Sequence, residues 1–168
     1  MRQQLLDGVP VEVLEQRMWP GRWCAEGYLR QGDSLPDVIA ADAALLARLG
    51  VEPATVAARL ENLLERGSAS EWEAVRVDGW LVTIRRTRKM RACPWAESNI
   101  ALCRVGAGAI KLSSNDFEIR RRGVGGVLEG TGLSVHLIRD HGFFCGPSTP
   151  YRIEPEFAVN ALMLIPGS

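Results

Sequence analysis

The chain has 168 residues, with 20 Lys and Arg against 20 Asp and Glu, 46% hydrophobic and 24% charged residues, which is the composition of an ordinary globular domain. A chain of this length buries enough surface to form its own core, so it needs neither a disulfide framework nor a structural metal. Its formal net charge of zero argues against a protein that binds polyanions over its whole surface.

The four cysteines are too widely spaced for a secreted disulfide scaffold; they are Cys24, Cys93, Cys103 and Cys145. The first residues do not form a basic segment followed by an apolar one, as a secretory leader does. The longest apolar runs are far shorter than the roughly 20 residues that span a bilayer. We therefore predict a cytoplasmic protein with reduced thiols and no membrane partner.

The first 67 residues predict helices. Pro10 suits a first-turn position before an apolar repeat at helical spacing. Ser34 and Asp37 resemble a capping box that opens a second helix, which ends at Gly50. Pro53 opens a third helix, and Gly67 is expected to close it in the left-handed conformation.

After residue 70 the hydrophobic period changes from 3.6 to 2, which predicts strands. Asp78-Gly79 is a strong hairpin turn, and a two-residue loop would place Val77 opposite Trp80. Further strands are expected at 100–105, 117–121 and 135–139, with glycine-rich turns at 123–126 and 130–132. Residues 154–164 fit a short helix or a strand.

These elements predict a single α+β domain over residues 1–168. Its helical part covers residues 1–67, and this part packs on a mostly antiparallel sheet formed by residues 72–168.

The corner between the second and third predicted helices resembles the helix-turn-helix of bacterial DNA-binding proteins. The resemblance covers residues 45–60 and rests on Leu49-Gly50-Val51 followed by Ala54-Thr55-Val56. The hairpin at 75–84 stands where a winged variant of that family has its wing. The resemblance implies a winged-helix-like DNA-binding protein, although the positions that would face DNA, such as Glu52 and Ala57, offer no donor for base edges.

Charge is distributed unevenly along the chain. Residues 1–70 carry seven basic and ten acidic side chains, a net charge of −3, whereas residues 76–122 carry eleven and four, a net charge of +7. Two runs of basic residues end predicted strands and are candidates for binding an acidic protein or a nucleic acid: Arg85, Arg86, Arg88, Lys89 and Arg91, and Arg120, Arg121 and Arg122. If the two strands are neighbours, we expect one positive patch, and the alternative is a solvated strand face.

The segment 136–152 holds the densest set of reactive residue types, including both histidines of the chain. Its candidates for ligand or partner binding are His136, Arg139, Asp140, His141, Tyr151 and Arg152. On a strand, His136 would point to the opposite side from Arg139, and Asp140 and His141 would lie in a turn. A small enzyme could use His136, Asp140 and His141 with Cys145 as nucleophile, but Cys145 between aromatic residues fits a buried position better.

A zinc site is a weaker alternative. Cys93, Cys103 and Cys145 with one of the two histidines would supply four ligands, but tight sites usually contain a pair spaced by two to four residues. We recognise no such pair and predict no metal and no cofactor. No candidate catalytic set has both the right residue types and a supported geometry, and the corner helix lacks side chains that read bases. We therefore favour a non-enzymatic ligand- or partner-binding domain with its site near residues 136–152, and the DNA-binding and enzymatic alternatives stay open.

Overall fold

The computed structural model describes residues 3–105 and 113–165, except for the side chains of residues 89, 90, 113 and 114. Within these residues the elements follow in the order β1 (Leu5–Leu6), β2 (Val9–Pro10), α1 (Val11–Met18), α2 (Leu35–Leu49), α3 (Pro53–Gly67), β3 (Val75–Val77), β4 (Trp80–Arg91), β5 (Ser113–Arg121), β6 (Leu128–Thr131), α4 (Gly132–His141) and α5 (Pro155–Ala161).

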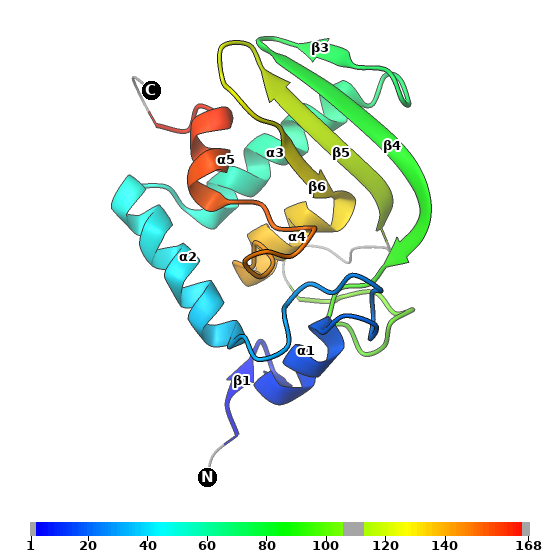
Figure 1. Ribbon diagram of the computed structural model, residues 1–168, viewed down its shortest axis with the longest axis vertical. Helices are drawn as coiled ribbons and strands as arrows, with labels where there is room; N and C mark the ends of the chain where they lie inside the picture. The colour runs from blue at the N-terminus through cyan, green and yellow to red at the C-terminus, as the bar shows by residue number, and fades with distance from the viewer. Residues whose placement is uncertain (1–2, 106–112, 166–168) are drawn as a thin grey trace.

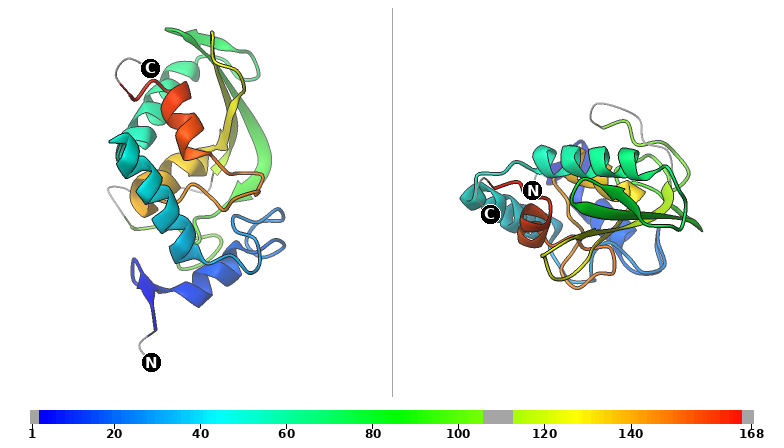
Figure 2. Two further views of the ribbon diagram at one scale, coloured as in Figure 1. Left: turned by 60° about the vertical axis from the view of Figure 1, so that its left-hand side comes forward. Right: turned by 90° about the horizontal axis from the view of Figure 1, so that it is seen from above.

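The predicted α+β class is confirmed. Strands β3 to β6 form one antiparallel sheet in chain order, and β1 pairs with β2 in a separate hairpin. Helices α3 and α4 pack against each other and against one face of the larger sheet, and Figures 1 and 2 show the helices gathered on that side. None of the described helices is long and apolar enough to cross a bilayer.

The residues that predicted the ends of α2 and α3 can be compared with the contacts that they make. The Ser34 hydroxyl accepts a hydrogen bond from the Asp37 amide, and Gly50 closes α2 in the left-handed conformation at φ 68°. Gly67 differs from its prediction, because it is the last residue of α3 and not a left-handed cap. A Cβ at Gly67 would lie 2.4 Å from the Val82 Cγ1 atom, so this glycine lets α3 approach β4 closely.

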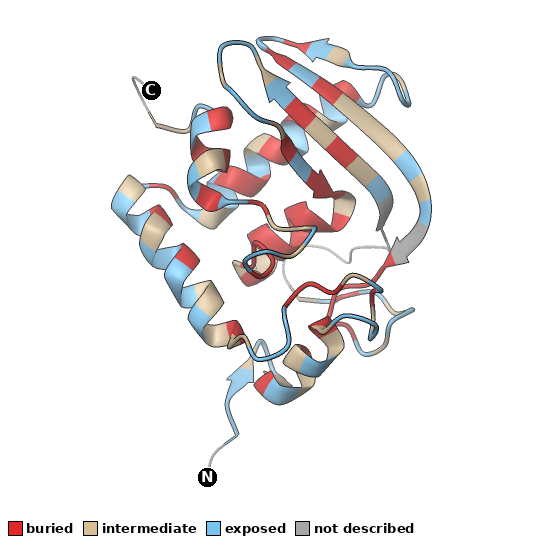
Figure 3. Cartoon of the chain, viewed as in Figure 1, coloured by how far each residue is buried: buried red, intermediate tan, exposed pale blue. Residues whose placement is uncertain are grey.

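The predicted hairpin has the expected register. Val77 pairs with Trp80 and Val75 with Val82. Across the next two strands Val82 pairs with Ile119, and Ile119 with Leu128. These side chains are buried, and Figure 3 shows buried positions alternating with exposed ones along the sheet.

The expectations for 100–105, 130–132 and 135–139 are wrong. The first segment is irregular apart from one bridge residue, Cys103, and Gly130 lies inside β6, where the Phe117 ring leaves no room for a Cβ. Residues 135–139 belong to α4, which is buried on most sides, so its sequence lacks the one-sided pattern of a surface helix. Of the two alternatives for 154–164, the helix is confirmed as α5.

Two hydrophobic clusters form the core. The first lies between the sheet and α3, and the second joins α1 to the irregular segments near residues 24–29 and 93–103. Helix α4 belongs to both clusters, because Val135 and Ile138 pack in the first, while Leu133 and Leu137 pack in the second. This helix therefore connects the two parts of the core.

We predict that Gly67→Ala destabilises the protein by up to about 2 kcal/mol, which is the cost of overpacking less the gain in helix propensity. The new methyl group must displace Val82, and overpacking of this kind typically costs about 1–3 kcal/mol, which outweighs the gain in helix propensity of about 1 kcal/mol. Gly125→Ala is the matched control, because no atom lies within 4 Å of the added Cβ and its backbone is not left-handed. Urea denaturation of both variants measures the difference, and equal midpoints would contradict the packing role of Gly67.

Candidate metal centre

Helix α4 carries both histidines of the chain. It begins with a capping box, in which the Thr131 side chain accepts from the Ser134 amide and the Ser134 hydroxyl accepts from the Thr131 amide, and it ends at Gly142 in the left-handed conformation. His136 and Asp140 are one helical turn apart, so their side chains meet. His141 is the last helical residue, and the two imidazole rings lie edge to face with centroids 5.0 Å apart.

The two cysteines of the site come from the irregular segment that follows β4. Cys93 opens a turn closed by the Ala96 amide, and the Arg17 guanidinium of α1 donates to the carbonyl oxygens of Pro94 and Ala96. The Trp95 ring stacks on the His141 ring with a centroid distance of 3.9 Å. Helices α1 and α4 thus hold this segment from two sides.

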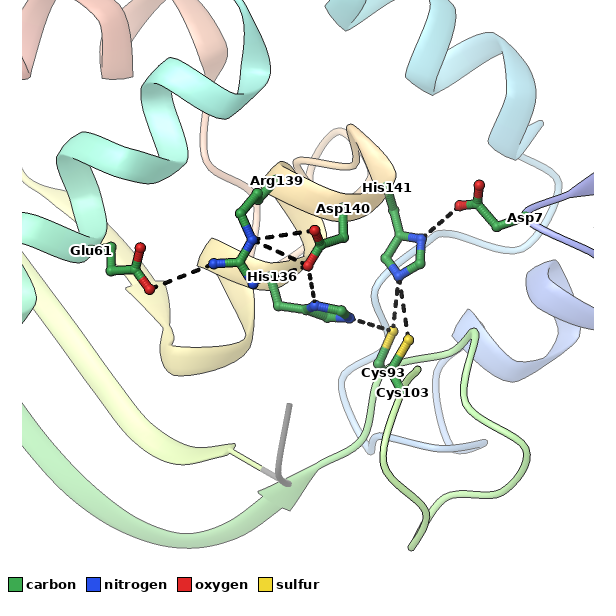
Figure 4. A network of polar contacts seen from close by, with 8 residues as sticks. All are labelled: Asp7, Glu61, Cys93, Cys103, His136, Arg139, Asp140 and His141. Carbon is green, nitrogen blue, oxygen red and sulfur yellow. Dashed lines mark hydrogen bonds and ion pairs between the residues drawn. The ribbon is translucent and has the colours of Figure 1, made fainter. Parts of the chain in front are cut away.

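Four ligand atoms converge at one buried point, where Figure 4 shows both thiols facing the two imidazole rings. They belong to Cys93, Cys103, His136 and His141, and all lie within 4.8 Å of one another. The Cys93 Sγ atom is 3.3 Å from His136 Nε2 and 3.4 Å from His141 Nε2, and Cys103 Sγ is 3.6 Å from His141 Nε2. A tetrahedral zinc site with bonds of about 2.0–2.3 Å has ligand separations of roughly 3.5 Å, so these distances fit one central ion.

A carboxylate fixes each imidazole. His136 Nδ1 lies 2.7 Å from Asp140 Oδ2, and His141 Nδ1 lies 2.8 Å from Asp7 Oδ2 in the turn between β1 and β2. An ionised carboxylate only accepts, so each Nδ1 carries the proton and each Nε2 presents a lone pair to the thiols. Metal-binding histidines in proteins are commonly oriented in this way.

Burial favours the neutral forms of both histidines and of Cys93. All four residues are buried, and burial lowers the pKa of His141 to about 4 and lowers the pKa of His136 as well. Burial also raises the pKa of the Cys93 thiol. A divalent cation would reverse the preference of the thiols, because two thiolates and one such ion have no net charge.

The donor set suits zinc better than other common ions. Two thiols and two imidazoles in a tetrahedral arrangement are typical ligands of Zn²⁺, whereas Mg²⁺ and Ca²⁺ prefer oxygen. All four positions of a tetrahedron are supplied by the protein, which is typical of structural rather than catalytic zinc sites.

The sequence grouped these ligands differently. The structure brings together both histidines with Cys93 and Cys103, while Cys145 stays outside the cluster, where burial raises the pKa of its thiol to about 12. The prediction that the sequence contains no closely spaced ligand pair is wrong. Four residues separate His136 from His141, and this spacing is that of the close pair that tight sites usually contain. Placing His136 on a strand hid its contact with Asp140, since four residues span about 13 Å in a strand but one turn in a helix.

The remaining candidates of the segment 136–152 make internal contacts. The Arg139 guanidinium pairs with Asp140. The Tyr151 hydroxyl donates to Glu26, and the Arg91 guanidinium lies over the Tyr151 ring. A cavity of about 200 Å³ opens beside Tyr151 and Pro150, and its lining includes acidic residues of β5 and β6.

The two basic runs do not form one patch. Strands β4 and β5 are neighbours but antiparallel, so Arg91 pairs with Ser113 and Arg120 with Leu81, at opposite ends of the sheet. Three residues of the first run form ion pairs with acidic residues: Arg85 with Glu118, Arg86 with Glu71 and Arg91 with Asp116. Arg88 is exposed, and the side chain of Lys89 lies outside the described residues.

The corner between α2 and α3 has the predicted helices, but its DNA-binding interpretation stays a prediction. Helix α3 buries Val56, Leu60 and Leu63 against the core. Its exposed side includes Glu61 and Glu65, and their negative charge would repel a phosphate backbone.

Comparison with known proteins gives no assignment, because no protein-family model, no curated protein and no solved structure matches this chain.

Arg152 provides a test of whether the segment 136–152 has a structural role. Its guanidinium forms two hydrogen bonds with the buried carboxylate of Asp42 on α2, at 2.6 and 2.8 Å. We expect Arg152→Leu to lower the free energy of unfolding by about 3–5 kcal/mol, because Asp42 is left buried and unpaired. The double variant with Asp42→Leu should recover much of the loss. Thermal or urea unfolding measures both, and an unchanged stability of Arg152→Leu would contradict this assignment.

Proposed function

We propose that this protein binds one zinc ion through Cys93, Cys103, His136 and His141, and that the ion has a structural role. The observation that carries the proposal is the convergence of four buried ligand atoms within 4.8 Å, of which three separations, 3.3–3.6 Å, match the edge of a tetrahedral site. The hydrogen bonds from both Nδ1 atoms to Asp140 and Asp7 support it, because they leave both Nε2 lone pairs for the ion.

The ion would link parts of the chain that are far apart in sequence. Cys93 and Cys103 belong to the irregular segment after β4, and the histidines belong to α4. Asp7 adds the β1–β2 turn through its contact with His141. Among the described residues, the turns of the segment 92–105 are closed by the Ala96 and Ala101 amides, and metal coordination would add to its order. The proposal departs from the prediction of no metal, although the predicted site region 136–152 supplies two of the four ligands.

A cysteine nucleophile is the second candidate. Cys93, His136 and Asp140 form a chain of contacts of 3.3 and 2.7 Å, which resembles the order of groups in a cysteine–histidine–acid triad. Two observations weigh against it. The second thiol and the second imidazole serve no purpose in a triad, and Cys93 is only 2% exposed, so a substrate carbonyl could not reach it without rearrangement.

Metal analysis of the purified protein tests the first proposal. We expect one equivalent of zinc per chain by plasma mass spectrometry, and replacement by Co²⁺ should give the absorption bands of a tetrahedral thiolate site. Cys103→Ser should lose most of the metal, whereas Cys24→Ser should keep it, because Cys24 is a buried cysteine outside the ligand cluster.

Failure of the wild-type protein to bind zinc or cobalt after reconstitution would overturn the proposal. Alkylation then separates the second candidate, because a nucleophilic Cys93 in metal-free protein should react rapidly at neutral pH. A zinc-bound Cys93 should be protected until a chelator removes the ion.

The contact between Asp7 and His141 predicts a second measurable effect. We expect Asp7→Asn to weaken zinc binding about 10–100-fold, the usual effect of losing a carboxylate that orients a metal-bound histidine. Competition with a chromophoric chelator measures the affinity. Asp33→Asn is the control, because Asp33 lies in a loop outside the cluster, and an equal loss in the two variants would contradict the role of Asp7.

A further inference from the structure

A cleft of about 290 Å³ lies at the end of the sheet where β3 turns into β4, and we call it the arginine cleft. It is lined by Arg76, Gly79, Leu81, Arg120, Arg121 and Arg122. The cleft lies where β4 begins, whereas Cys93 follows the end of β4 at Arg91, and Figure 1 shows these two ends of the strand far apart. It is therefore independent of the proposed zinc centre.

The strand register places the arginines side by side. Arg76 pairs with Leu81, and Leu81 pairs with Arg120, so these three side chains lie in one row on the face of the sheet opposite the helices. With strands about 4.8 Å apart, the two arginines of this row flank Leu81 across roughly 10 Å. Leu81 is 39% exposed and forms an apolar floor between them.

The positive charge of the cleft has little compensation from the protein. All four charged residues of its lining are arginines. Arg120 has one long contact of 3.8 Å with Glu118, a carboxylate that Arg85 already holds. The side chains of Arg76 and Arg122 have no ion-pair or hydrogen-bond partner among the described residues. Like charges gathered in this way repel each other unless an anion joins them.

The register separates Arg121 from the other three arginines. Arg121 pairs with Trp80, whose buried ring faces the helices, and the Arg121 guanidinium lies 5.5 Å from the centre of that ring. The side chains left to bind a ligand on the outer face are those of Arg76, Arg120 and Arg122. The Arg122 amide donates to the Gly79 carbonyl, which ties the end of β5 to the turn and reduces the backbone freedom lost on binding.

We propose that the arginine cleft binds a ligand that carries two or more linked phosphate groups. Guanidinium groups bind phosphate oxygens through paired hydrogen bonds, and a diphosphate group carries enough negative charge to balance most of the charge of Arg76, Arg120 and Arg122. A long nucleic acid fits less well. Glu118 and Glu129 pair with each other two residues further along the strands from Arg120, so a continuing backbone would meet two acids about 7 Å away.

Titration calorimetry with inorganic pyrophosphate at low salt tests the proposal. We expect saturable 1:1 binding, tighter than that of orthophosphate by tenfold or more. The double variant Arg76→Ala/Arg122→Ala should weaken pyrophosphate binding at least tenfold. Arg30→Ala is the control, because Arg30 is exposed in a loop away from the sheet, and it should bind like the wild type. Adenosine diphosphate as a second probe distinguishes a nucleotide from a free diphosphate.

Zinc content measured after each titration separates binding in the cleft from removal of metal by pyrophosphate, since only binding in the cleft depends on Arg76 and Arg122. Absence of pyrophosphate binding would overturn the proposal. So would equal binding by the double variant and the wild type. Affinity for single-stranded oligonucleotides that exceeds pyrophosphate affinity and rises with length would replace the proposed ligand with a nucleic acid.

Discussion

Two hydrogen bonds between histidine Nδ1 atoms and carboxylates determine how the histidines face the cysteines of the second hydrophobic cluster. Asp140 and Asp7 fix the tautomer of His136 and His141, so both Nε2 atoms turn their lone pairs toward Cys93 and Cys103. Without these bonds, two neutral imidazoles and two thiols in an apolar cluster could satisfy one another in several ways. With them, the four ligand atoms have one arrangement, and it is the one that suits a tetrahedral cation.

Helix α4 transmits this constraint to the rest of the fold. Its capping box and its left-handed Gly142 fix both ends, and its apolar side chains divide between the two clusters of the core. A ligand bound at His136 and His141 is therefore connected through one short helix to α3 and the sheet. The β1–β2 turn joins the same centre through Asp7, although Asp7 and His141 are 134 positions apart in the sequence.

The elements that the sequence predicted correctly are those with local causes. A serine cap, a left-handed glycine and an Asp-Gly turn specify α2 and the β3–β4 hairpin within a few residues. Helix α4 was mistaken for a strand because burial on most sides removes the pattern of an amphipathic helix. Gly130 and Gly67 were read as turn and cap residues, although each is required by a side chain from a distant strand or loop.

The proposed metal ligands could be predicted only in part from the sequence. The spacing of His136 and His141 was a usable signal, and Asp140 one turn from His136 strengthened it. The proximity of Cys93 and Cys103 to these histidines could not be predicted, because it depends on where an irregular segment folds back onto a buried helix.

The net charge of zero was equally uninformative about where the charged side chains lie in space. Antiparallel pairing places the two basic runs at opposite ends of the sheet, although the sequence suggested one positive patch. It also brings Arg76 close to Arg120, Arg121 and Arg122 at one end of the sheet, a cluster that the net charge of the chain does not reveal.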